Sequence, residues 1–160
     1  MPLSFPLALL LSTQSFGSWV YEEATDPITD QMSGAIQATS DNGKAKLIVA
    51  CDKTQKNRPM TIQLVTDQFI GSSRGTVIDR INAESPSEER WDFGGKRAML
   101  FDDYQVWSFV RRLYRANTVF MRVYDYNGAI VDNKFTLSGT NDALAKVTQA
   151  CGQPDFAKRK

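Results

Sequence analysis

Two cysteines, Cys51 and Cys151, stand a hundred positions apart (151 minus 51) in a chain without histidine. This spacing excludes a redox-active Cys-x-x-Cys motif, and two thiols without histidine are too few ligands for a structural zinc site. In an oxidising compartment such a pair forms a disulfide, which is the pairing that we expect. The alternative is two buried, apolar thiols. A bridge would join the apolar strand that ends at Cys51 to the C-terminal end of the fold.

The first 17 residues have the pattern of a secretory signal peptide. An apolar run from Leu3 to Leu11 is followed by small and polar residues up to Gly17, as a cleavage site requires. The run is shorter than the ~20 apolar residues of a membrane-spanning helix, so we expect no stable membrane insertion. We therefore expect a signal peptide at 1–17 and a periplasmic or secreted protein. A truncated start and an N-terminal strand of the fold are the alternatives.

Length and composition favour one globular domain. The chain has 160 residues, of which 42% are hydrophobic and 23% are charged, close to the average of soluble globular proteins. We expect a single domain at 18–152 and a basic C-terminal tail at 153–160. The formal net charge of +1 provides no long-range field that would attract nucleic acid, so no nucleic-acid partner is expected.

Short strands separated by turn residues predict a mainly β fold of the α+β class, with an antiparallel, β-sandwich-like sheet built from hairpins. Asn42-Gly43 and Asn127-Gly128 each supply the positive φ angles of a tight hairpin turn. The first pair predicts a hairpin over residues 28–51, and the second predicts one that begins at "TVFMRVYDY". Further strands are predicted at "MTIQLVT" and "TVIDRI", and a small hairpin at "WDFGGKRAMLF".

Two segments have the periodicity of amphipathic helices. In "DDYQVWSFVRRLYRAN", apolar side chains recur at three- and four-residue spacing, with aspartates at the front and arginines at the back, as the helix dipole favours. "GTNDALAKVTQACG" is the second helix, with Thr140 or Asn141 as its N-cap and Gly152 at its end. We expect these two short helices to pack on the sheet.

The composition excludes most catalytic classes. Without histidine there is no Ser-His or Cys-His catalysis and no imidazole metal site. A carboxylate pair could serve a glycosidase, but we interpret Glu88 and Glu89 as residues of a polar loop and Asp102 and Asp103 as helix-capping residues. The glycines match neither phosphate-binding motif. We therefore expect a protein that is not an enzyme and that has no cofactor or metal.

Two features are candidate binding elements. Arg111, Arg112 and Arg115 in "RRLYR" could bind phosphate or an acidic partner through their guanidinium forks. The alternative for these arginines is a solvated helix C-terminus. Trp91 is the tryptophan that we expect to be exposed, because we place it in a loop rich in serine, proline and glutamate. Exposed aromatic residues anchor protein interfaces.

A longer pattern of spacing extends over most of the chain. The pattern consists of a tryptophan after the leader, "TDPITD", the apolar strand that ends in Cys51, Trp91, the helix after Phe101, "FMRV", "FTLSG" with "DALAKV", and the final Cys151. In this spacing the chain resembles the VasI-like type VI secretion-associated proteins, within a wider group of small exported proteins. The resemblance implies a small, mainly β periplasmic protein with a disulfide between the two cysteines. It also implies an accessory role in an envelope secretion machine, and it implies no catalytic residues.

We therefore expect a non-enzymatic periplasmic binding or accessory protein, associated with type VI secretion, whose partner is an envelope or secretion-apparatus protein. It would contact that partner through a sheet face or through the Trp91 loop. The alternative is a secreted inhibitor or immunity-type protein that binds an envelope hydrolase, with an exposed loop at residues 82–95 as the inserting element.

Overall fold

The computed structural model describes residues 12–53 and 60–152. In these residues ten strands form one sheet in the order β1-β2-β3-β4-β5-β8-β7-β6-β9-β10, and every neighbouring pair is antiparallel. The expected mainly β, α+β fold is confirmed. The strands are β1 (Ser12–Phe16), β2 (Trp19–Thr25), β3 (Met32–Thr39), β4 (Ala45–Asp52), β5 (Met60–Thr66), β6 (Arg74–Ile81), β7 (Ser87–Gly94), β8 (Arg97–Leu100), β9 (Thr118–Tyr124) and β10 (Ile130–Thr136).

The predicted hairpins lie where their turn residues indicated. β3 pairs with β4, β7 with β8, and β9 with β10. At the first and last of these turns, Gly43 and Gly128 have φ angles of +74° and +78°, which residues with a Cβ rarely adopt. The chemistry of these turns is local, so the sequence predicts them well.

Strands β1 and β2 were not predicted as a hairpin. β1 falls within residues 1–17, the expected signal peptide, and it forms one edge of the sheet by pairing with β2. For residues 12–16 this arrangement agrees with the alternative of an N-terminal strand. Residues 1–11 of the expected leader and the basic tail at 153–160 lie outside the described residues.

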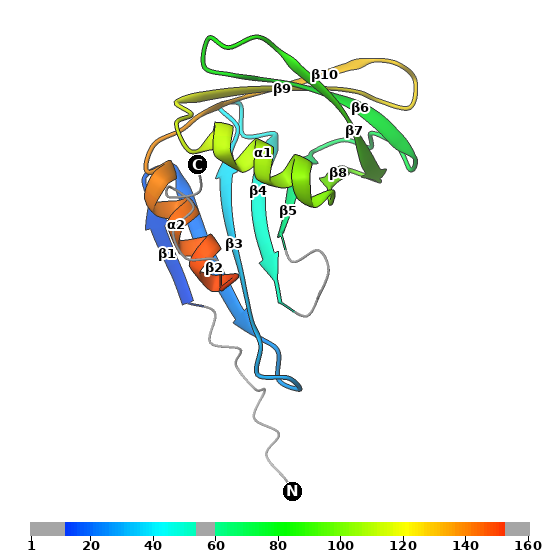
Figure 1. The fold of residues 1–160 in the computed structure, drawn as a ribbon. Helices are drawn as coiled ribbons and strands as arrows, with labels where there is room; N and C mark the ends of the chain where they lie inside the picture. Colours follow the sequence, from blue (N-terminus) through cyan, green and yellow to red (C-terminus); the bar gives the residue numbers. More distant parts are fainter. Residues whose placement is uncertain (1–11, 54–59, 153–160) are drawn as a thin grey trace, which may run out of the picture.

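The sheet bends over, and both helices lie on its inner side. Figure 1 shows β1 to β5 running steeply, with β6, β7, β9 and β10 crossing above them. Helix α2 (Thr140–Ala150) packs on β2, β3 and β4, and helix α1 (Asp103–Leu113) packs on β5. On its other side α1 meets β7, where the rings of Phe109 and Trp91 lie edge to face with centroids 6.0 Å apart. Helix α1 therefore joins the two halves of the sheet.

The helices begin with different caps. Asp102 caps α1, as expected, because its carboxylate accepts a hydrogen bond from the backbone N–H of Gln105 at 3.0 Å. The cap predicted for α2 is wrong: the N-cap is Gly139, and no side chain caps this end. The Thr140 hydroxyl instead accepts a hydrogen bond from the indole N–H of the buried Trp19 at 3.0 Å. The Thr140 hydroxyl thus bonds to a residue that is distant in the sequence and does not serve as the N-cap of α2.

The side chains of the sheet alternate between a buried inner face and an outer face. In β4, Leu47, Val49 and Cys51 are buried, whereas Ile48 and Ala50 are half-buried. The inner face and the two helices form the core. No helix in the described part of the chain is long and apolar enough to span a membrane.

Candidate functional site

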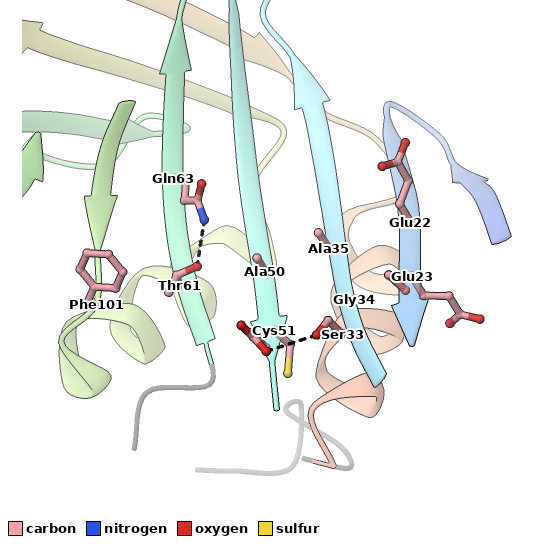
Figure 2. A pocket seen from close by; sticks show the side chains of 12 residues that line it. Glu22, Glu23, Ser33, Gly34, Ala35, Ala50, Cys51, Thr61, Gln63 and Phe101 are labelled. Atoms are coloured by element: carbon pink, nitrogen blue, oxygen red, sulfur yellow. Dashed lines mark hydrogen bonds between the residues drawn. The ribbon is translucent and has the colours of Figure 1, made fainter. Parts of the chain in front are cut away.

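The outer face of β2, β3, β4 and β5 is hollowed into an open trough of about 670 Å³. Figure 2 shows its side chains standing on these four strands, with the helices behind the sheet. Phe101, which follows β8, lies at one side of the trough. The lining residues are Glu22, Glu23, Ala24, Ser33, Gly34, Ala35, Ala50, Cys51, Asp52, Thr61, Gln63 and Phe101.

A row of short side chains forms the floor of the trough. Glu22 on β2 faces Ala35 on β3, which faces Ala50 on β4, which in turn faces Thr61 on β5. An alanine methyl rises only one carbon above the sheet, so the middle of the row is lower than its two ends. Because neighbouring strands lie about 4.8 Å apart, the row is roughly 14 Å long.

Polar side chains around the floor are held by hydrogen bonds. The Ser33 hydroxyl donates to Oδ1 of Asp52 at 3.3 Å, and the Gln63 amide donates to Oγ1 of Thr61 at 3.3 Å (Figure 2). Arg97 on β8 donates to Oε1 of Gln63 from outside the trough. These bonds order the polar rim and leave the alanines as an apolar centre.

Carboxylate side chains line part of the trough. Glu22 is exposed on the outer face, and Asp52 lies on the same face. The carboxylate of Glu23 instead accepts a hydrogen bond from the hydroxyl of the buried Tyr21 at 2.8 Å, and burial together with this bond raises the pKa of Tyr21. Among the described residues that line the trough there is no lysine or arginine. The trough therefore combines an apolar floor with an acidic rim.

The strands under the trough are held from behind by the disulfide and by α2. Cys51 and Cys151 form the expected bridge, with their Cα atoms 5.6 Å apart. A Cβ added to Gly34 would lie 3.0 Å from the Cβ of Ala150 and 2.8 Å from the hydroxyl oxygen of Tyr21. The missing side chain at Gly34 therefore lets α2 approach the back of β3 closely. The floor of the trough rests on a tightly packed layer.

A second polar cluster lies inside the fold and contains one of the predicted binding residues. Arg112 on α1 donates to both carboxylate oxygens of Asp79 on β6, at 2.6 and 3.0 Å. Asp79 is 2% exposed. The pKa of the neighbouring Glu89 is raised, mainly by burial and also by the charge of Asp79, while a hydrogen bond from Trp91 opposes the shift. This cluster fastens α1 to the sheet.

The expectation that Trp91 is exposed is wrong. Trp91 lies on β7 and not in a loop, and it is 1% exposed. Along β7 the exposed Glu88 and Arg90 alternate with less exposed residues on the other face, and Trp91 lies on that inner face, where it contacts α1. The expected exposed loop at 82–95 is therefore limited to the residues before β7 and a short turn after it.

The other predicted site residues are not gathered into one place. Arg112 is held in the interior ion pair, whereas Arg111 and Arg115 are exposed. A binding role for these two exposed arginines stays a prediction. Glu88 and Glu89, interpreted as loop residues, are successive residues of β7 and so point to opposite faces. The described part of the chain contains no group of three or more histidine, cysteine, aspartate or glutamate residues that could hold a metal ion.

Sequence reasoning missed the trough. Its lining residues come from short stretches of several strands, many of their side chains are small or mildly polar, and they form no sequence motif. The available signal was the alternation in β3 and β4, where Ala35 and Ala50 fall on the face opposite the strongly apolar residues. That these two alanines lie side by side depends on strand register, which the sequence did not specify.

Comparisons with known proteins reveal a similar fold. No family model matches the sequence, and no curated protein matches it. Among solved structures, the crystal structure of invasion associated protein B from Bartonella henselae is similar with a TM-score of 0.59. The similarity covers 86% of this chain and 95% of that chain, at 12% sequence identity. At this identity it supports the mainly β, α+β architecture and concerns the fold alone.

Proposed function

We propose that this chain is a non-enzymatic binding or accessory protein of an extracytoplasmic compartment, and that it contacts a partner protein through the outer trough. The observation that carries the proposal is the open hollow with an apolar floor on β2 to β5. Hollowed apolar surfaces bordered by polar residues are typical of interaction sites. The half-buried side chains of Ile48, Val65 and Met99 extend this outer face beyond the trough.

The compartment is proposed from the disulfide and the N-terminal sequence. Disulfides persist in oxidising compartments such as the periplasm, and the bridge between Cys51 and Cys151 supports such a location. The apolar run at 3–11 agrees with export. N-terminal sequencing of the exported protein tests this part. We expect a new terminus at Ser18, and a terminus at or before Ser12 would contradict cleavage after Gly17.

The partner is proposed to be an envelope or secretion-apparatus protein, in particular a component of type VI secretion. This step rests on the spacing of residues that resembles the VasI-like proteins. An accessory role also agrees with a surface that offers shape and charge but no histidine or metal-binding cluster in the described residues.

Site-specific photocrosslinking in intact cells tests the proposal. A photoreactive phenylalanine analogue replaces Glu22 at the rim of the trough, and the matched control carries the analogue at Glu84, which is also exposed but lies between β6 and β7. Mass spectrometry should identify a secretion-apparatus protein crosslinked from position 22 and not from position 84. The absence of any adduct specific to position 22 would refute a partner at the trough.

The inhibitor alternative is decided by the same experiment. Its expected inserting loop is largely replaced by β7, which leaves residues 83–86 as the exposed part of the connection. An envelope hydrolase crosslinked from position 84, together with stoichiometric inhibition of that enzyme by the purified chain, would favour the inhibitor over the accessory protein.

A further inference from the structure

We infer that the trough binds an extended peptide segment of its partner, in which a basic residue stands beside apolar side chains. The inference rests on the proposed binding function and adds the chemistry of what is bound. It follows from three properties of the lining: its apolar centre, the sign of its charge and its dimensions.

The centre of the trough is suited to apolar side chains. Ala35 and Ala50 are cross-strand partners on the outer face, and Ala24 lines the same trough near the acidic rim. The Phe101 ring adds an apolar wall on the side of β5. A ligand side chain placed over the alanines would remove apolar surface from water on both partners, which is favourable in proportion to the area buried.

The rim of the trough is suited to a positive charge. The whole chain has a formal net charge of +1, yet the exposed carboxylate of Glu22 places a negative charge at the β2 end of the trough. Arg97 on β8 lies on the opposite side of the trough from β2 and donates to Gln63. Complementary charge steers encounter and determines orientation, so a basic residue of the ligand is expected at the β2 end.

The dimensions favour a peptide over a lipid chain. The floor is about 14 Å long, which corresponds to roughly four residues of extended chain at ~3.3 Å each. An acyl chain would need a long, enclosed apolar cavity, whereas this trough is open and carries polar groups on its rim. A peptide backbone that lies over the alanines would pass beside the polar side chains of Thr61 and Gln63, which hydrogen-bond to each other.

The first experiment is an NMR titration of the purified, oxidised full-length chain, labelled with ¹⁵N. The probe is the acetylated, amidated peptide Gly-Lys-Leu-Ala-Leu-Gly. Two control peptides replace its lysine by glutamate or both leucines by serine. We expect amide shifts that cluster on Ala35, Ala50 and Thr61 with the probe, and binding weaker by about fivefold or more with each control.

Variants of the chain then test the same surface. Glu22→Lys reverses the charge at the rim and should weaken binding of the lysine peptide by about fivefold or more. Glu88→Lys is the matched control, since it makes the same change on an exposed residue of β7 outside the trough. Ala50→Phe fills the floor without a change of charge and should abolish the shifts. Far-ultraviolet circular dichroism and the melting temperature verify that each variant is folded.

Several outcomes would overturn the inference. One is equal affinity for the lysine and glutamate peptides, and another is undiminished binding by the folded Glu22→Lys and Ala50→Phe variants. Shifts on the same residues with zwitterionic phosphatidylcholine micelles and not with peptide would indicate a lipid site. Shifts that depend only on protein concentration would indicate a second copy of this chain in the trough.

The inference and the proposed function can fail separately. If photocrosslinking from position 22 captures an envelope protein but no peptide binds as predicted, the accessory function stands and the peptide chemistry is wrong. If the lysine peptide binds as predicted but no cellular protein is crosslinked, the trough binds peptides and the proposed function is refuted.

Discussion

Reduction of the disulfide should lower the free energy of unfolding by about 4–5 kcal/mol. The bridge between Cys51 and Cys151 spans 100 positions. In the chain-entropy treatment, closing a loop of this length lowers the entropy of the denatured chain by about 16 cal/mol/K, which is ~4.7 kcal/mol at 25 °C. Since whole domains are stable by only about 5–15 kcal/mol, the bridge accounts for a large share of the stability.

Two perturbations separate the loop constraint from the packing of the sulfur atoms. The reduced wild-type chain keeps both side chains, whereas a Cys51→Ala, Cys151→Ala chain also leaves a small cavity beside the core, where Cys51 is 1% exposed. We expect the double variant to be less stable than the reduced wild type by ~1 kcal/mol. At a typical urea m-value of about 2 kcal/mol/M, reduction should lower the unfolding midpoint by about 2 M.

Tryptophan fluorescence in urea, with and without reductant, measures the effect. Trp19 and Trp91 are 0% and 1% exposed, so unfolding will change their emission strongly. The melting temperature should fall by roughly 15 °C, given an unfolding entropy of about 0.3 kcal/mol/K for a domain of this size. A midpoint that moves by less than about 0.5 M in a fully reduced sample would refute the loop-entropy argument for this chain.

Three further predictions concern the interior cluster and one close backbone contact. Arg112→Met should lower the free energy of unfolding by about 3–5 kcal/mol, because it leaves the buried Asp79 unpaired. The control Arg122→Met, at an exposed ion pair, should lower it by less than about 1 kcal/mol. Equal losses for the two variants in urea titrations would contradict this. Burial raises the pKa of Glu89 above its ordinary 4.5, so the stability tied to its protonated form is present below that value and is lost as the pH rises through the raised pKa. As the pH rises from about 4.5 through the raised pKa of Glu89, the Glu89→Gln variant should therefore become more stable relative to wild type. If the free energies of unfolding of the two chains ran parallel from pH 4 to 8, this prediction would be wrong. Gly75→Ala should destabilise the fold by about 1–3 kcal/mol, since the added Cβ would lie 2.2 Å from a buried phenylalanine ring. The control Gly94→Ala should be nearly neutral in calorimetry, because its added Cβ would lie 3.5 Å from the nearest atom.

Several elements of the fold could be predicted because their causes are local. A hairpin at Asn42-Gly43 follows from the φ angles that the turn needs, and α1 follows from a period of three and four residues that ends in basic side chains. The pairing of Cys51 with Cys151 was also expected, because the chain offers no other cysteine. Each of these statements needs only neighbouring residues or the composition.

Other features depend on contacts between distant segments. The polar residues before Trp91 suggested a loop, but pairing with β6 and β8 made the segment a strand and buried the ring against α1. Arg111 and Arg112 are adjacent arginines that the sequence alone does not distinguish. Only Arg112 pairs with Asp79, which lies 33 positions earlier. A charged side chain can be buried where an opposite charge packs against it, and here that partner comes from a distant part of the sequence.

The candidate site shows the same division. The sequence by itself determined that β3 and β4 alternate apolar and small side chains, so that one face had to enter the core and the other had to remain outside. Only the tertiary structure decided that Ala35 and Ala50 face each other with Glu22 at one end. A shift of the register by one residue would turn each side chain to the other face, so the trough exists only because core packing selects one register.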